Sequence, residues 1–487
     1  MAYFSGIVNI WLPPKDKCAI LMMFFTEREV NPMSKQIPPI KLSEKLGFGT
    51  FSTASNVVFN FKDLFYLFFL TNVMGIQIAH AGIITAIGII WDAINDPLVG
   101  YWAVNHRFKN GEKCRPLALW CAVPWAITVV LMFTCFDVSY GLKFGIAISI
   151  YFLFELFNTF AAIPYNSMGS LATNVDADRR AINVARNLGG CVGSAIGSLA
   201  LYPLLDLFGG LDEAGNVLQD ANGEHAFFCA AIVMGCVCIV GSLAHYFTTR
   251  ERVQQESEDN SKIPFLTAVK MLVSCRSWVI NMLYIICYGM LNLLVMSTVN
   301  YYATYVLGSG AAATPILAAF LVTSVVATLL ASPIDRKLGR RKTMIFSAII
   351  HIVGKIWFVL DPYSMGAIYC NGIFVAFSMA LAFVCFNTNR NNIADLVEHK
   401  NGRRIDSLVS TCDNLASKLA KAGANLLMTG ALAAAGFNAE LPTQPQGAVD
   451  TICALLGWVP MIVACIMLLI VFFHPIEKEM EEMKQKV

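Results

Sequence analysis

Trp91-Asp92-Ala93-Ile94-Asn95-Asp96-Pro97 decides the fold, because it places two carboxylates inside an apolar run from roughly 76 to 103. The run is long enough to cross a bilayer as a helix, and each ionised side chain at its centre costs about 2.5–3.5 kcal/mol on insertion scales. On a helix, Asp92 and Asp96 lie on one face about 6 Å apart, with Asn95 beside them. Such an arrangement suits a bound cation or a shared proton.

The rest of the chain is as apolar as this run. Of the 487 residues, 56% are hydrophobic and 14% charged, and the mean hydropathy is +0.60. A long soluble array of helices is excluded, because each of its helices needs a polar face and these runs are apolar all round. Hydropathy therefore predicts an all-α polytopic membrane protein with twelve transmembrane helices, near 47–74, 77–103, 117–136, 144–172, 184–208, 225–248, 277–306, 314–332, 343–360, 366–389, 407–436 and 449–473.

Basic residues predict the orientation of these spans. The loops after the second, fourth, sixth, eighth and tenth spans hold twenty Lys and Arg residues, whereas the opposite loops hold only Lys143. Because cytoplasmic loops carry the excess of Lys and Arg, both termini are expected in the cytoplasm. The expected location is the cell membrane, crossed many times.

The spans divide into two halves of six, each with a basic loop after its second helix. Such a parallel repeat is typical of a transporter whose binding site lies at the membrane midplane between the halves. Residues 1–32 are of uncertain translation, since Met33 is an alternative start. The predicted organisation is a cytoplasmic extension at 1–40, six-helix bundles at 41–249 and 277–474, a cytoplasmic linker at 250–276 and a charged cytoplasmic tail at 475–487.

Several unlinked motifs, in order, carry a resemblance to a known family. They are Gly47-Phe48-Gly49, Leu70-Thr71-Asn72-Val73, the stretch Trp91 to Pro97, Ile163-Pro164-Tyr165, Ala394-Asp395-Leu396-Val397-Glu398, Arg404-Ile405-Asp406-Ser407 and His474-Pro475. Residues from about 41 to 480 thereby resemble the glycoside–pentoside–hexuronide:cation symporters, a branch of the major facilitator superfamily that includes the melibiose permease. The resemblance implies the major facilitator fold and cation-coupled symport of a sugar, glycoside or hexuronide by alternating access.

The resemblance also implies a cation site made of Asp92, Asn95, Asp96 and Thr159. All four side chains carry oxygen, which hard cations prefer as a ligand. We expect Na⁺ as the coupling ion because Asn95 and Thr159 add oxygens that a proton does not need; H⁺ stays open, since close carboxylates favour protonation. In a second interpretation, one acid merely pairs with Lys or Arg of a neighbouring helix. No other cofactor or metal is expected.

The substrate residues match the family less well. Galactoside carriers of this family use an acid on helix one and another on helix four, where this chain has Asn56 and Ala162. The helix-one positions Asn56, Asn60 and Asp63 recur at i, i+4 and i+7, which predicts one polar stripe facing the cavity.

Three further residues of the family's pocket persist, namely Arg186, Phe386 and Lys418. Because Arg binds carboxylates well, Arg186 and Lys418 favour a sugar acid over a neutral sugar; the alternative is that both residues bind hydroxyls. The sequence assigns no functional role to Lys62, Glu155 or Lys421; for Lys62, an ion pair with an acid such as Glu155 and extension toward the membrane surface both stay open.

Charged residues at the predicted cytoplasmic ends suggest a gate. We expect Asp395, Glu398, Arg404 and Asp406 to form ion pairs between the halves when that side is closed. Neither His-Glu-x-x-His nor Gly-x-Ser-x-Gly occurs, so we expect no enzyme. The alternatives are a carrier of amphiphiles, lipids or drugs, and a sensor that binds substrate without moving it. The expected partners are a small sugar or sugar acid and the lipid bilayer, without nucleic acid, and the chain is expected to be a monomer.

Overall fold

The computed structural model describes residues 39–485 except 107, 109–110, 174, 253–271, 402–405 and 442. Over these residues the chain is helical, and extended backbone pairs only in an isolated bridge between Leu211 and Val217. The all-α class is confirmed. Most of the expected N-terminal extension and of the expected linker lies outside the described residues.

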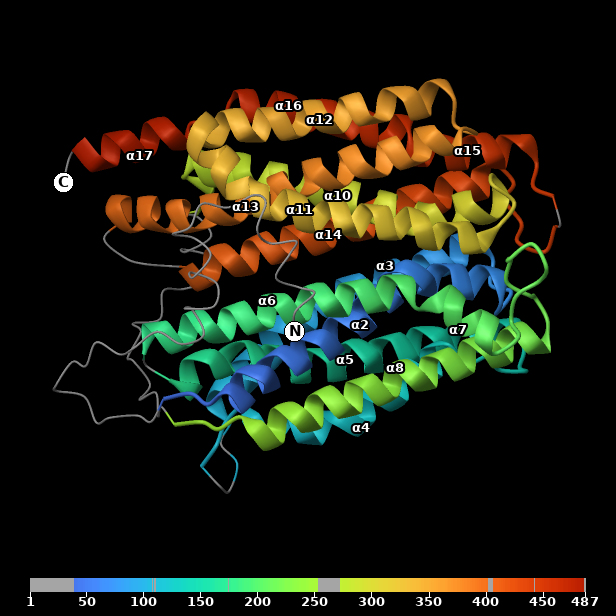
Figure 1. Cartoon of the computed structure of the whole chain (residues 1–487), viewed down its shortest axis with the longest axis horizontal. Helices are drawn as coiled ribbons and strands as arrows, with labels where there is room; N and C mark the ends of the chain where they lie inside the picture. Colours follow the sequence, from blue (N-terminus) through green and yellow to red (C-terminus); the bar gives the residue numbers. More distant parts are fainter. Residues whose placement is uncertain are drawn as a thin grey trace, which may run out of the picture.

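The first six predicted spans lie together, coloured blue to green in Figure 1. The short α7 continues α6 after a bend of 48°. The helices of this group are α2 (Leu42–Asn72), α3 (Ile78–Asn105), α4 (Arg115–Met132), α5 (Tyr140–Ala172), α6 (Asp176–Leu199), α7 (Leu201–Leu207) and α8 (Ala221–Thr248).

The last six predicted spans form a second group, coloured from yellow-green to red in Figure 1. A 3₁₀ turn at Gly310–Ala312 leads into its second helix. The charged tail forms a helix of its own, α17 (Ile476–Gln485), whose first residue is buried. The other helices are α10 (Arg276–Tyr305), α11 (Ala313–Leu338), α12 (Arg340–Leu360), α13 (Met365–Asn401), α14 (Asp406–Ala434), α15 (Gln446–Leu456) and α16 (Trp458–Phe472).

Each of the twelve predicted spans coincides with one helix or with a consecutive pair, α6–α7 or α15–α16. Among the described helices, nine are long and apolar enough to cross a membrane, and the bent α6–α7 pair makes ten. The charged helices α2 and α14 fall outside this set, yet their 31 and 29 residues reach about 45 Å at 1.5 Å per residue. The chain is therefore a multi-pass membrane protein.

Glycine allows α2 and α6 to pack in close contact. Gly189, Gly193 and Gly197 recur every four residues along α6. A Cβ atom added at any of them would lie 2.1–2.2 Å from a backbone carbonyl oxygen of α2, a distance that no real side chain tolerates. This close approach fixes α2, which carries the predicted polar stripe, against its neighbour.

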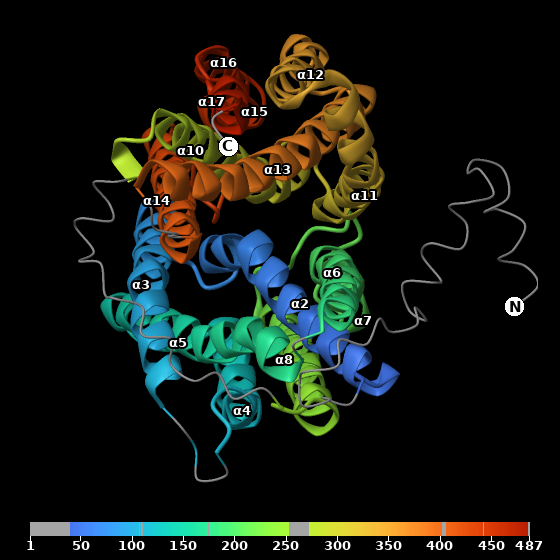
Figure 2. The same cartoon turned by 90° about the vertical axis from the view of Figure 1, so that its left-hand side faces the viewer.

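The two groups of helices face each other through α2, α3 and α6 on one side and α10, α11 and α14 on the other, as Figure 2 shows end-on. At the end where α2 leads into α3, hydrogen bonds join the groups. The Thr71 hydroxyl lies 2.9 Å from the Tyr301 hydroxyl, and the Asn300 amide donates to the Leu64 carbonyl at 2.6 Å. The protein is thus closed at this end, opposite to the end where α2 begins.

Candidate functional site

The two carboxylates of the quoted stretch lie on the face of α3 that turns toward the second group of helices. The Asp92 side chain is 13% exposed and that of Asp96 36%. On another face, Ile94 and Leu98 are 52% and 61% exposed, as expected for residues that meet lipid. The apolar face thus meets the membrane and the acidic face meets the protein.

Lys418 of α14 extends across the interface between the two groups of helices and binds both acids. Its Nζ atom lies 2.7 Å from Asp92 Oδ2 and 2.6 Å from Asp96 Oδ2. An ammonium group therefore supplies the positive charge between two carboxylates that one helix turn holds together. The sequence grouped Lys418 with the substrate residues, whereas in this conformation it pairs with both acids, the kind of contact that the second interpretation of these carboxylates describes.

Thr159 and Asn95 occupy the α5 side of the same site. The Thr159 hydroxyl donates to Asp96 Oδ1 at 3.3 Å. The Asn95 amide donates to the backbone carbonyl of Glu155 at 3.2 Å. Of the four predicted cation residues, Asp92, Asp96 and Thr159 therefore converge, while Asn95 holds α3 against α5.

A cavity of about 260 Å³ opens beside this site, between the two groups of helices. Its polar lining includes Asn60, Lys62, Asp63, Asp92, Glu155, Ser194, Asn292, Lys418, Lys421 and Asn425, and its apolar lining includes Phe59, Leu293, Met296 and Phe320. Polar side chains from both halves thus share one chamber. A chamber of this kind can bind a small hydroxylated solute through many hydrogen bonds.

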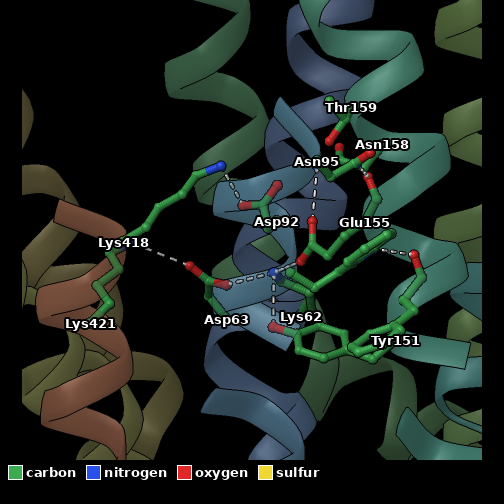
Figure 3. Close-up of polar contacts among 12 residues, drawn as sticks. Lys62, Asp63, Asp92, Asn95, Tyr151, Glu155, Asn158, Thr159, Lys418 and Lys421 are labelled. Carbon is green, nitrogen blue, oxygen red and sulfur yellow. Dashed lines mark hydrogen bonds and ion pairs between the residues drawn. The ribbon is translucent and has the colours of Figure 1, made fainter. Parts of the chain in front are cut away.

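Lys62 of α2 lies fixed in the wall of the cavity (Figure 3). Its Nζ atom is 2.6 Å from Glu155 Oε1 on α5, and the two side chains are 6% and 1% exposed. The Tyr151 hydroxyl lies 3.4 Å from the same nitrogen. The rings of Phe59, Tyr151 and Phe154 surround it with centroids at 5.0–5.5 Å, so the ammonium is held by one carboxylate and three aromatic faces.

Asp63, the neighbour of Lys62, is a third exposed and lies between two ammonium groups. Its Oδ1 atom is 3.3 Å from Lys62 Nζ, and its Oδ2 atom is 3.6 Å from Lys421 Nζ on α14. The contact with Lys421 crosses between the two groups of helices beside that of Lys418, as Figure 3 shows. Asp63 therefore connects the two halves at the cavity itself.

Of the other predicted substrate residues, some line the cavity and others do not. Asn60 lines the cavity and donates to the Ser194 hydroxyl at 3.1 Å. Asn56 donates instead to a backbone carbonyl of its own helix, at Ser52. Phe386 is buried in the second group, where it packs on Tyr288 at a centroid distance of 5.0 Å. In this conformation neither Asn56 nor Phe386 lines the cavity.

Arg186 also lies away from the cavity, where its guanidinium group packs on the rings of Tyr165 and Phe48 at 4.2 and 5.2 Å. It donates to the backbone carbonyls of Tyr165 and Asn166. The structure thus ties the guanidinium group to α5 and does not bring it together with Lys418. The gate residues cannot be compared, since the side chains of Asp395, Glu398, Arg404 and Asp406 lie outside the described residues.

Three cavity residues were left without a role by the sequence, namely Lys62, Glu155 and Lys421. The signal that marks them is their charge inside apolar runs, which by itself indicates a functional position. The pairing of Lys62 with Glu155, which the sequence left open, is confirmed. The contact between Lys421 and Asp63 could not be derived, because the two residues lie in different halves of the chain. The packing of the helices in the structure identifies the partners of these residues.

Comparison with known proteins identifies the family of this chain. A profile of the family described as "MFS/sugar transport protein" matches residues 47–478. An isoprimeverose transporter of Lactiplantibacillus pentosus is 26% identical over 446 residues, covering 90% of this chain and 89% of its own. The putative glycoside/cation symporter YagG of Escherichia coli is 27% identical over 436 residues, covering 87% and 89%.

Solved structures share the fold at low sequence identity. A bacterial homolog of the human lysosomal transporter Spinster, in an inward-facing and unoccupied conformation, has a TM-score of 0.69 at 14% identity, covering 90% of this chain and 97% of its own. The nucleoside transporter NupG has a TM-score of 0.64 at 12% identity, covering 88% and 99%. At such identities the likeness establishes the fold alone.

Proposed function

Because this chain belongs to the MFS/sugar transport family of the major facilitator superfamily, we propose that it is a secondary active transporter that moves a sugar or glycoside together with a monovalent cation. The family assignment confirms the resemblance found in the sequence. The chain is a transport protein of the membrane; its coupling ion and its substrate class are the proposal.

The observation that carries the proposal is the bridge from Lys418 to Asp92 and Asp96. Two carboxylates one turn apart inside a membrane protein require a positive charge between them. In this conformation a lysine of the opposite half supplies it. A mobile cation that binds the same carboxylates takes over that charge and frees the lysine, so cation binding alters the connection between the halves.

Sodium is the cation we favour. The Thr159 hydroxyl at Asp96 adds a third oxygen-bearing side chain to the two carboxylates, and Na⁺ needs several oxygen ligands. A proton needs only one carboxylate and remains the alternative. The donor set contains neither sulfur nor imidazole, which fits a hard cation better than a transition metal.

The charges around the cavity support a single monovalent cation and a neutral substrate. With every group ionised, three lysines (Lys62, Lys418 and Lys421) face four carboxylates (Asp63, Asp92, Asp96 and Glu155), which leaves one negative charge. One bound Na⁺ or H⁺ cancels it. A bound sugar acid would bring back one excess negative charge, and Arg186 does not line the cavity to balance it. We therefore propose a neutral sugar or glycoside as the substrate, in place of the sugar acid that the sequence favoured.

The proposed location is the plasma or inner membrane of the cell. The basic loops indicate an orientation in which both termini lie in the cytoplasm. The end closed by Thr71, Tyr301 and Asn300 then faces outward. In this orientation the structure corresponds to a carrier closed to the outside, one of the two states that alternating access requires.

Sodium-dependent uptake into proteoliposomes tests the proposal. We expect Na⁺ to stimulate uptake of isoprimeverose or methyl β-D-glucoside and to raise the unfolding temperature of the purified protein, relative to choline at equal ionic strength. Replacing Asp92 and Asp96 together by Asn should abolish both effects. Asp206→Asn, an exposed carboxylate on α7, is the matched control and should change neither.

Uptake that ignores both Na⁺ and pH would contradict cation coupling. Uptake that ignores Na⁺ but follows a proton gradient would favour the proton alternative at the same carboxylates. The double variant separates these outcomes from an indirect salt effect, because it removes the charges and keeps the shape of both side chains.

A further inference from the structure

We propose that Asp63 and Lys421 form the subsite that binds substrate hydroxyls, with one residue contributed by each half, and that the buried Lys62–Glu155 pair positions Asp63 for this task. The inference rests on the proposed transport function and names its substrate contact. The ligand class is a neutral polyhydroxylated solute such as a pyranoside.

Asp63 has the geometry of a ligand-binding carboxylate. A third of its side chain is exposed, and the exposed part faces the cavity. Its two oxygens point to different lysines, at 3.3 Å from Lys62 and 3.6 Å from Lys421. The second distance is longer than a direct charged hydrogen bond of about 2.7–2.9 Å, so this contact is weak and open to an inserted group.

A pair of neighbouring hydroxyls fits between Asp63 and Lys421. The carboxylate accepts O–H bonds, and the ammonium group donates to the hydroxyl oxygens. Asn60, Asn292 and Asn425 line the same cavity and offer further amide donors and acceptors. A neutral solute satisfies all of these groups without adding charge, whereas a carboxylate on the ligand would face Asp63.

The Lys62–Glu155 pair is too buried to bind a ligand directly, yet it fixes Asp63. Glu155 Oε1 and the aromatic rings hold the Lys62 ammonium in one place, and that ammonium lies 3.3 Å from Asp63 Oδ1. The carboxylate is thus held from one side by Lys62 and only weakly from the other side, where Lys421 lies at 3.6 Å.

The same pair joins the hydroxyl subsite to the cation site. Glu155 accepts a hydrogen bond from Asn95 through its backbone carbonyl, and one turn further along α5 Thr159 contacts Asp96. On the other side of the interface between the two groups of helices, Lys418 and Lys421 lie one turn apart on α14. A cation that releases Lys418 therefore acts on the helix that also carries Lys421, and the reciprocal effect must be equal in free energy.

Equilibrium binding tests the subsite. The probes are isoprimeverose, methyl β-D-glucoside and methyl β-D-glucuronide, measured by calorimetry on the purified full chain in saturating Na⁺. We expect the neutral probes to bind in preference to the glucuronide. Asp63→Asn and Lys421→Gln should each weaken neutral-probe binding at least about tenfold, as for loss of a charged hydrogen bond of about 1.5–3 kcal/mol, while thermal stabilisation by Na⁺ alone stays within about twofold.

Neutral-probe affinity that survives both substitutions would overturn the subsite, as would a preference for the glucuronide or binding of none of the probes. These results leave Na⁺ stabilisation, and with it the cation coupling, unaffected. Loss of Na⁺ stabilisation in the wild type with sugar binding intact would instead overturn the coupling and leave the subsite standing.

The positioning role needs a separate variant, because Lys62→Met alone strands the buried Glu155, and Glu155→Leu alone takes from Lys62 its nearest carboxylate. The double variant Lys62→Met with Glu155→Leu removes both charges at similar volume and should fold. We expect its neutral-probe affinity to fall about tenfold with little change in Na⁺ stabilisation. A folded double variant that binds the sugar as wild type does would show that the pair only stabilises the protein and would overturn its positioning role.

Discussion

Breaking the Lys62–Glu155 pair should produce a large loss of stability with a distinctive pH dependence. The two side chains are 6% and 1% exposed and 2.6 Å apart, so removal of Lys62 strands Glu155 away from water, and removal of Glu155 takes from Lys62 its nearest carboxylate and leaves only Asp63 at 3.3 Å. Breaking a buried pair costs about 3–5 kcal/mol, whereas replacing both members with apolar groups is often neutral or stabilising. We therefore expect Glu155→Gln and Lys62→Met each to destabilise the protein by about that amount, and the double variant Lys62→Met with Glu155→Leu to recover most of it.

The pH dependence of the two single variants should be opposite. In Glu155→Gln the group that loses its nearest partner is an ammonium, which becomes neutral as pH rises, so the stability deficit should shrink with rising pH. In Lys62→Met the stranded group is a carboxylate, which becomes neutral as pH falls, so the deficit should shrink with falling pH. In both cases the neutral form no longer carries the cost of a buried charge.

Denaturant unfolding in detergent micelles, followed by tryptophan fluorescence without ligand, measures these differences relative to the wild type at each pH. Glu482→Gln is the control, because its partner Lys478 lies 3.9 Å away with 82% of its side chain exposed. Such an exposed pair contributes little, so this variant should match the wild type. Single variants as stable as the wild type, or deficits that change in the same direction with pH, would refute the interpretation of a charged pair.

Three further outcomes are expected. Gly193→Ala should lower stability by about 1–3 kcal/mol in the same unfolding assay, because its Cβ would lie 2.2 Å from a carbonyl of α2, whereas Gly190→Ala meets nothing closer than 3.4 Å and should be tolerated. Asn300→Ala removes one hydrogen bond of about 1 kcal/mol at the closed end and should raise cysteine labelling of the cavity from that side roughly fivefold. Replacing Asp395 by Asn together with Arg404 by Gln should raise labelling from the cytoplasmic side and lower turnover more than substrate affinity; unchanged labelling with intact turnover would leave these charges a role in topology alone.

The fold and the acidic core of the site could be predicted because both depend on local sequence. Twelve apolar runs give twelve helical spans by length alone, and the spacing of Asp92 and Asp96 places them on one helix face. Asn60 and Asp63 reach the cavity for the same reason. At Asn56 the stripe stays a prediction, since in this conformation its amide donates to the Ser52 carbonyl and the residue does not line the cavity.

Contacts between helices could not be predicted in this way. Lys418 and Asp96 are 322 positions apart, and no periodicity of the sequence indicates that the lysine of one half binds the acids of the other half. The substrate role of Arg186 stays a prediction, because hydropathy places the residue near a span end but does not say which neighbour its guanidinium group contacts. Backbone carbonyls of α5 bind it, and residue type alone cannot reveal such partners.

The position of Lys418 and Lys421 on α14 gives a physical reason for coupling in the proposed cycle. In this conformation two sets of ion pairs join the halves at the cavity, one at Asp92 and Asp96 and one at Asp63. The proposed cation replaces Lys418 at the first set, and the proposed sugar is inserted between Asp63 and Lys421 at the second. Without the cation, the four carboxylates exceed the three lysines by one negative charge, which is costly away from water. With both ligands bound, the cation cancels that charge and the sugar bridges Asp63 to Lys421, so the fully loaded carrier moves its halves with the charges of the cavity balanced.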